Sequence, residues 1–215
     1  YKIEHGVRLI TFDKMWEKKY QLLQKKILNV LICIKHNDVA FVRRTLLFLS
    51  AISYLSPNDT VFYILADCQG DVRGELEEWM RNKKGELVFS QCEDYRNEIL
   101  NIFTKTNYGK VGNSIMIDIG VFFEPILVHE ALKTLEVSKD IDVIVPYAEK
   151  KDGTYYNLKY FETKEGEHIF PKAPKESFYV NRAFGGVAFM KTECLFKGCW
   201  KEDGFHVKGK ILLMI

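Results

Sequence analysis

Short apolar runs that alternate with longer amphipathic segments constrain the fold of this chain more than any other feature. The runs are NVLICI, TVFYILA, GELVFS, NSIMID and DIDVIVPY. The segments between them, which we expect to be helical, cover residues 39–54, 72–81, 94–106 and 125–135. Continuous apolar strands that alternate with helices are typical of a parallel sheet buried on both faces. The order therefore predicts an α/β domain with a mostly parallel central sheet flanked by helices.

The two ends of the chain depart from this alternation. Residues 2–26 are charged, and four apolar residues there are spaced by three or four, which predicts an amphipathic helix leaning on the main body: Phe12, Trp16, Tyr20 and Leu23. Residues 148–179 mix glycine, charge and aromatic side chains, so we expect an irregular excursion or a small antiparallel flap. AFGGVAFMK then predicts a strand, TECLFK a short helix, GCWKEDGFHVKG a polar loop and residues 211–215 a last strand.

Composition excludes several classes of protein. The 215 residues, 47% of them hydrophobic, suffice for one large domain. The net charge of +2, from 31 basic and 29 acidic side chains, gives no support to bulk electrostatic binding of nucleic acid or membrane. No apolar stretch approaches the roughly 18 residues that cross a bilayer. The chain opens on Tyr1 rather than Met, which is compatible with a trimmed upstream anchor.

The five cysteines show no CxxC or CxxH spacing, which argues against structural zinc. Cys33 lies within an apolar run and is expected to be a buried thiol. Cys194 and Cys199 are candidates for a disulfide in an oxidising compartment.

Polar residues follow the apolar runs at the points where we expect strands to end. Lys35, Asp67 and Asp118 hold such positions, and we expect the two aspartates to end neighbouring strands. Ligands bind at the carboxyl ends of parallel strands, so either carboxylate is placed to contact a nucleotide or a cation; each is equally placed to cap the next turn. The sequence lacks GxGxxG, GxxxxGK[ST] and GxSxG, which disfavours dinucleotide binding, P-loop chemistry and an α/β-hydrolase.

Several motifs in order resemble those of a GT-A type glycosyltransferase: Asp67, then YRNEIL, SIMIDIGVFFEP, DIDVIVPY, YYNLKYFETKEG, FGGVAFMK and a late histidine. The chain is most similar over residues 29–207 to the fungal Golgi mannosyltransferases of the mannan-polymerase kind. The capsule-associated mannosyltransferases and related sequences of large viruses come next. The resemblance implies one GT-A domain, residues 1–215, with a helical extension (1–28), a nucleotide-binding half (29–147) and an acceptor-side half (148–215).

The same resemblance implies transfer of a hexose, with mannose favoured, from a GDP- or UDP-linked sugar to a glycan or glycoprotein acceptor. The location would be the Golgi lumen, reached through a trimmed anchor, or the cytoplasm of a virus-infected or bacterial cell. Implied donor-binding residues are Lys35, Asp67, Arg96, Asn97, Asp118, Gly185 and Gly186.

Further implied roles concern the acceptor and the metal. Tyr155, Tyr156 and Asn157 would contact the acceptor, and Glu202 and Asp203 would be catalytic, because they lie where the family keeps acidic residues near the acceptor. An inverting transferase needs a base for the acceptor hydroxyl, whereas in the retaining mannosyltransferases that this chain resembles the leaving diphosphate can take that proton. Asp118 and His206 would bind Mn²⁺ or Mg²⁺. Structural alternatives are a solvated Arg96, a bulge at the glycine pair and core packing of the tyrosines.

The sequence departs from the family at one position. The family has Asp-x-Asp at the tip of its fourth strand, whereas this chain has Asp118, Ile119 and Gly120. One carboxylate neutralises less of the charge of a divalent cation than two. This departure favours an alternative, a catalytically impaired module that binds nucleotide or glycan. A nucleotidyltransferase is a third reading, disfavoured because KHND after the first strand lacks glycine.

Overall fold

The computed structural model describes residues 2–4, 7–9, 27–56, 59–106, 112–124, 126–147, 162–166, 176–184, 186–201, 204–206 and 209–214. Its helices are α2 (Val39–Leu55), α3 (Gly70–Met80), α4 (Tyr95–Lys105), α5 (Ile126–Val137) and α6 (Thr192–Lys197). Its strands are β1 (Lys2–Glu4), β2 (Val7–Leu9), β3 (Ile27–Ile34), β4 (Asp59–Ala66), β5 (Lys84–Phe89), β6 (Gly112–Asp118), β7 (Val143–Pro146), β8 (Glu162–Thr163), β9 (Phe178–Arg182), β10 (Val187–Lys191), β11 (Cys199–Lys201), β12 (Gly204–His206) and β13 (Ile211–Met214).

Nine of the described strands form one sheet in the order β5-β4-β3-β6-β10-β7-β13-β9-β8. The neighbours from β5 to β6 are parallel, as are β7 and β13. β10 runs antiparallel to β6 and β7 on its two sides. The predicted α/β fold with a mostly parallel sheet is therefore confirmed. The sheet also continues through β7, β10 and β13, across the boundary predicted at residue 147.

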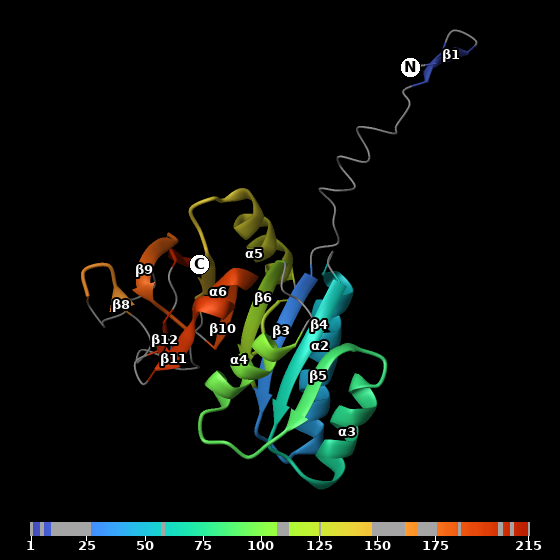
Figure 1. Cartoon of the computed structure of the whole chain (residues 1–215), viewed down its shortest axis with the longest axis vertical. Coiled ribbons are helices and arrows are strands. Elements are labelled where there is room, and N and C mark those ends of the chain that lie inside the picture. The colour runs from blue at the N-terminus through green and yellow to red at the C-terminus, as the bar shows by residue number, and fades with distance from the viewer. Residues whose placement is uncertain are drawn as a thin grey trace.

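Helices cover both faces of this sheet (Figure 1). One core cluster joins the sheet to α2, α3 and α5, and the other joins it to α4, α6 and β11. β3 and β4 contribute side chains to both clusters, which explains why their sequences are apolar without alternation. Fully burying one such aliphatic side chain contributes about 1.5–3 kcal/mol.

Helix α2 begins where the sequence predicts it. The Asp38 carboxylate accepts a hydrogen bond from the Phe41 N–H, with an N to Oδ1 distance of 3.1 Å. This contact satisfies one of the amides that a helix leaves unpaired at its start. Residues spaced by three or four then face the sheet and are buried: Val42, Leu46, Leu49 and Ile52. The turn after β3 is thereby fixed at the carboxyl edge of the sheet.

Two predictions about the flanking segments differ from the structure. Residues 2–4 and 7–9 form the antiparallel pair β1–β2, not the start of a helix, and Phe12, Trp16, Tyr20 and Leu23 lie outside the described residues. The expected polar loop at residues 198–209 contains the antiparallel pair β11–β12. That segment was misread because Trp200 is flanked by polar residues, yet its ring is buried in the core.

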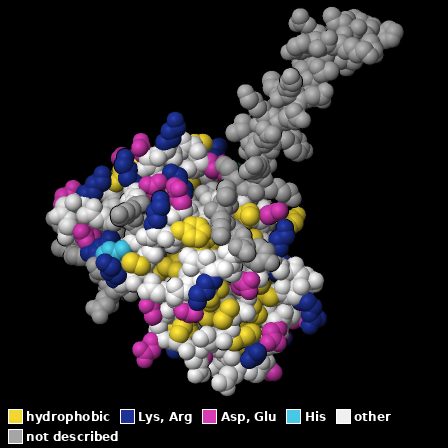
Figure 2. Space-filling model, viewed as in Figure 1, with side chains coloured by type: hydrophobic (Ala, Val, Ile, Leu, Met, Phe, Trp, Pro, Cys, Tyr) yellow, Lys and Arg dark blue, Asp and Glu magenta, His cyan; other side chains and the backbone are white. Residues whose placement is uncertain are grey.

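The surface carries charges of both signs. On the face shown in Figure 2, lysine and arginine are interspersed with aspartate and glutamate, in line with the net charge of +2. Among the described helices, none is long and apolar enough to cross a membrane. Cys194 and Cys199 are both free thiols, so the disulfide considered above is not formed in this structure.

Candidate functional site

Asp118, the last residue of β6, forms an ion pair with Arg96 at the start of α4. The Arg96 Nη2 lies 2.9 Å from Asp118 Oδ2 and 3.2 Å from Oδ1. Both side chains are about one quarter exposed, at 27% and 25%. Burial raises the pKa of the Asp118 carboxyl group above its ordinary value, and Arg96 opposes that shift. The Asp118 carboxylate therefore does not serve only a local turn, because it binds the guanidinium of a residue on α4.

Two aromatic rings enclose the Arg96 guanidinium. Its Cζ lies 4.4 Å from the centroid of the Trp200 ring and 5.2 Å from that of Phe184. The two rings pack edge to face, with centroids 4.9 Å apart, and both are buried. A cation over aromatic faces is attracted by their electron density. The guanidinium is thus held by a carboxylate and two rings, which lie on three segments of the chain outside α4.

Asn97 fixes the position of Trp200. Its Nδ2 donates to the Trp200 carbonyl at 2.9 Å, and its Oδ1 accepts from the Trp200 N–H at 2.8 Å. Its Nδ2 also lies 2.6 Å from Asp94, which caps α4 by accepting from the Asn97 N–H. Asn97 is therefore engaged with β11 in this structure. Its implied contact with a donor stays a prediction.

A second polar cluster surrounds Asp67, which follows β4. The Tyr95 hydroxyl donates to Asp67 Oδ2 at 2.6 Å, and Lys35 Nζ lies 3.9 Å from the same oxygen. Lys35 also lies over the Tyr95 ring, 5.0 Å from its centroid. The hydrogen bond to Asp67 raises the pKa of the Tyr95 phenol. Tyr95 and Arg96 are consecutive, so the first turn of α4 connects both aspartates.

The sequence led us to expect that the two aspartates end neighbouring strands, and the structure shows that they do not. β3 lies between β4 and β6 in the sheet. Two strand spacings separate them, or roughly 10 Å. The two carboxylates are therefore too far apart for one cation to bind both of them directly. The distance does match an extended ligand that contacts each cluster in turn.

An open hollow of about 450 Å³ adjoins Asp67 at the carboxyl ends of β3, β4 and β5. Its lining is mainly polar and comprises Lys35, His36, Asn37, Asp67, Cys68, Gln69 and Gln91. This is the edge at which open α/β sheets bind ligands. Donor and acceptor groups there suit a nucleoside, which presents ribose hydroxyls and the polar edge of a base.

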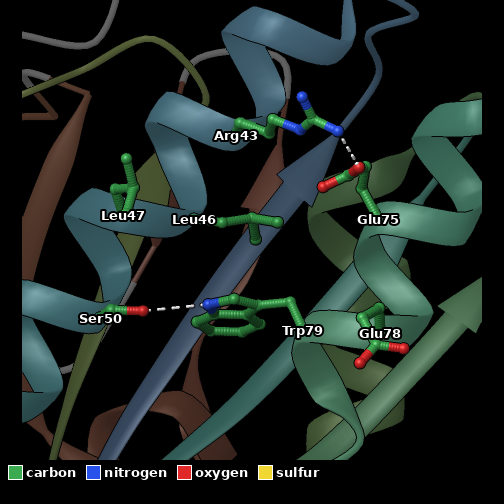
Figure 3. A pocket seen from close by; sticks show the side chains of 7 residues that line it. All are labelled: Arg43, Leu46, Leu47, Ser50, Glu75, Glu78 and Trp79. Carbon is green, nitrogen blue, oxygen red and sulfur yellow. Dashed lines mark hydrogen bonds and ion pairs between the residues drawn. The ribbon is translucent and has the colours of Figure 1, made fainter.

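A second hollow, of about 320 Å³, lies between α2 and α3 (Figure 3). Two contacts across it join the helices: the ion pair of Arg43 with Glu75, and a 2.9 Å hydrogen bond from Trp79 Nε1 to Ser50 Oγ. We interpret it as a groove of helix packing, because both contacts join side chains of the two helices.

Cys33 lies beside the ion pair, since it is the register partner of Asp118 in β3. Its thiol donates to the Tyr95 carbonyl at 3.4 Å. Burial, followed by the negative charge of Asp118, raises the pKa of Cys33 to about 12. Cys33 is therefore a neutral thiol near neutral pH and is unsuited to nucleophilic catalysis.

The predicted metal site is not assembled by the described residues. No three histidine, cysteine, aspartate or glutamate side chains come together as metal ligands in that part of the chain. Gly120, where the family has its second acid, has φ +84°, and a Cβ there would lie 3.2 Å from Phe41 Cζ of α2. His206 ends β12, paired with Cys199. Asp118 with Arg96 bound to it does not fit a divalent cation, which needs several oxygen ligands.

The other predicted residues divide into two groups. Gly186 lies beside the site, because its carbonyl accepts from the Asp118 N–H at 2.7 Å. The remaining predicted residues lie outside the described part of the chain: Tyr155, Tyr156, Asn157, Gly185, Glu202 and Asp203. Tyr95, Phe184 and Trp200 also belong to the site, although the sequence did not predict them as site residues. The sequence does hold a hint for each: Tyr95 precedes Arg96, Phe184 precedes the glycine pair, and Trp200 is a large apolar residue within an otherwise polar segment.

The sequence matches no protein-family model and no curated protein. Solved structures do match. The mannosyltransferase PcManGT from Pyrobaculum calidifontis, in complex with GDP-Man and Mn²⁺, is similar with a TM-score of 0.56 and 15% identity, over 87% of this chain and 54% of that chain. Glucosyl-3-phosphoglycerate synthase from Mycobacterium tuberculosis, in complex with phosphoglyceric acid, is similar with a TM-score of 0.54 and 14% identity, over 86% of this chain and 63% of that chain.

A further structure of the mycobacterial synthase, with Mn²⁺, uridine-diphosphate and phosphoglyceric acid, gives a TM-score of 0.51 at 11% identity and covers 86% of this chain and 62% of that one. This chain spans less than two thirds of the length of these proteins. Together with the sheet order, the matches show the GT-A fold of nucleotide-diphospho-sugar transferases. Three of the matching structures hold a nucleotide or a nucleotide sugar together with Mn²⁺ or Mg²⁺.

Proposed function

We propose that the chain transfers a hexosyl group from a nucleoside-diphosphate sugar to a glycan or glycoprotein acceptor. The observation that carries this proposal is the paired arrangement at the carboxyl edge of the GT-A sheet. There, Tyr95 binds Asp67, which lines an open polar hollow, and the next residue, Arg96, binds Asp118. Ligands of open α/β sheets occupy this edge.

In this proposal, each of the two clusters binds a different part of the donor. The nucleoside lies in the hollow lined by Lys35, Asp67 and Gln91, and the diphosphate extends towards Arg96. The two strand spacings between the aspartates, roughly 10 Å across the sheet, leave room for a nucleoside diphosphate bound in extended form. A guanidinium presents a planar fork of donors that matches phosphate oxygens.

Transfer breaks the bond between the sugar C1 and the diphosphate oxygen and forms a bond between C1 and an acceptor hydroxyl oxygen. Negative charge develops on the departing diphosphate, and a guanidinium already held in place stabilises that charge. The acceptor proton passes to a base or to the diphosphate. We propose Glu202 or Asp203 as that base, and Tyr155, Tyr156 and Asn157 as acceptor contacts, on the strength of the sequence resemblance.

Mannose is the proposed sugar. The sequence resemblance supports it, and so does the similarity to a mannosyltransferase crystallised with GDP-Man. The mycobacterial synthase was crystallised with uridine-diphosphate, so the proposal covers GDP- and UDP-linked donors.

Binding of nucleotides tests the donor class. Thermal unfolding is followed with GDP, UDP, ADP and CDP, each in buffer that contains Mn²⁺ and in buffer that contains EDTA. A ligand at 100 times its Kd stabilises the folded state by about 2.7 kcal/mol. We expect GDP or UDP to do so. If no nucleoside diphosphate raises the unfolding temperature in either buffer, the proposal is wrong.

A second candidate function is a binding module without transfer activity. It is favoured by the engagement of Asp118 with Arg96 and by glycine at position 120. Release of GDP from GDP-mannose, measured with and without mannose oligosaccharides, separates the two. Nucleotide binding without any release of GDP, or of UDP from UDP-hexoses, would support the binding module.

A further inference from the structure

We infer that Arg96 takes the place of a divalent cation at Asp118, so that this chain binds a nucleoside diphosphate without a metal ion. The inference rests on the proposed function and deepens it, because it concerns how the same site neutralises the diphosphate. Its basis is the ion pair itself, its aromatic enclosure and the unsuitability of the surrounding residues for a metal.

Among the described residues, the surroundings of Asp118 do not assemble a set of protein ligands for Mg²⁺ or Mn²⁺. Such ions take about six ligands, mostly oxygens, which one or two carboxylates supply together with waters and substrate phosphates. In the described part of the chain Asp118 belongs to no group of three potential metal ligands. Both of its oxygens accept from Arg96. A metal ion on either oxygen would therefore lie beside a fixed positive charge and be repelled by it.

Position 120 explains why no second acid completes the site. The backbone there has φ +84°, a conformation that side chains other than glycine rarely adopt. A side chain would also point at Phe41 of α2, whereas Arg96 reaches Asp118 from α4 on the other face of the sheet. An acid at position 120 would thus be strained and directed away from the ion pair.

The guanidinium is anchored independently of any ligand. Leaving Asp118 would also take Arg96 away from the rings of Trp200 and Phe184. Asn97 holds the Trp200 backbone through two hydrogen bonds and so keeps that ring in place. A fixed, permanently charged group of this kind costs little reorganisation when an anion binds.

Asp118 then has an effect opposite to that of a metal ligand. Its carboxylate positions Arg96, but its negative charge also repels a diphosphate. Asparagine has the same shape and an oxygen that still accepts from Arg96, without the charge. Metal-free binding thus predicts that Asp118→Asn keeps or strengthens nucleotide affinity, whereas a metal ligand at this position predicts loss.

The test is calorimetric titration of GDP and UDP into the whole chain, in EDTA and separately with Mn²⁺ and Mg²⁺. We expect binding in EDTA, with a Kd that Mn²⁺ changes by less than about threefold. Arg96→Ala should weaken binding by roughly 10- to 150-fold, the equivalent of losing one hydrogen bond to a charged group. Asp118→Asn should bind as tightly as the wild type or more tightly. Arg81→Ala is the matched control, because Arg81 pairs with Glu78 at the end of α3.

The outcomes separate this inference from the proposed function. Binding that requires Mn²⁺ or Mg²⁺ and is lost in Asp118→Asn overturns the inference and leaves the donor class intact. Absence of binding under all conditions overturns the proposed function itself. If Arg96→Ala does not fold by circular dichroism, Arg96→Gln replaces it, and wild-type affinity in either folded variant also overturns the inference.

Discussion

Asn97→Ala tests whether this amide positions the site or contacts the donor. The substitution removes both hydrogen bonds from α4 to the backbone N–H and carbonyl of the buried Trp200. A net intramolecular hydrogen bond contributes about 0.5–1.5 kcal/mol, and an unsatisfied buried group costs more. We therefore expect the free energy of unfolding to fall by about 1–3 kcal/mol.

Nucleotide affinity should fall as well, but indirectly. Trp200 encloses Arg96, so a loosened β11 leaves the guanidinium less well placed. We expect a loss of roughly 3- to 10-fold, smaller than the loss of a direct hydrogen bond to a charged group. The measurements are urea unfolding followed by tryptophan fluorescence, and calorimetric titration of GDP or UDP.

Asn101→Ala is the control for this experiment. Asn101 lies on the exposed side of the same helix, and its side-chain amide donates to Glu98 Oε2 at 3.3 Å. It should change neither quantity beyond about 0.5 kcal/mol. Unchanged stability of Asn97→Ala together with a large loss of affinity would refute the positioning role and support a direct donor contact.

Three further substitutions test separate parts of the structure. Gly120→Asp should lower stability by about 1–3 kcal/mol, because φ is +84° and Phe41 is close, and should not tighten Mn²⁺ binding; tighter binding would contradict this. Trp79→Phe removes the bond to Ser50 and should cost about 1 kcal/mol in urea unfolding, with nucleotide affinity unchanged. Because the pKa of Tyr95 is raised in the folded state, its hydrogen bond stabilises the fold below the phenol's ordinary pKa of about 10. This contribution is lost as the pH rises through the higher pKa of the folded state. Tyr95→Phe should remove this part of the fall in unfolding free energy at alkaline pH.

The sequence predicted the elements that depend on local patterns. The apolar runs identified β3, β4 and β6, because a strand covered on both faces needs apolar residues at every position. The cap of α2 by Asp38 is a local contact of the same kind, because its partner lies only three residues away. The positions of Lys35, Asp67 and Asp118 at strand ends followed from the same strand boundaries. The strand pair within residues 198–209 was not predicted, because a single buried tryptophan does not produce the alternation of apolar and polar residues by which a strand is recognised.

Only the tertiary structure decided which strands are neighbours and which side chains meet. The placement of β3 between β4 and β6 separates Asp67 from Asp118, and strand order leaves no mark on the local pattern. Arg96 and Asp118 are 22 residues apart, and Asn97 and Trp200 are 103 residues apart. Such contacts depend on how helices cross the sheet and on where the returning chain packs. The family resemblance pointed to Arg96 as a site residue, and the packing of β11 against α4 fixed that arginine on a carboxylate.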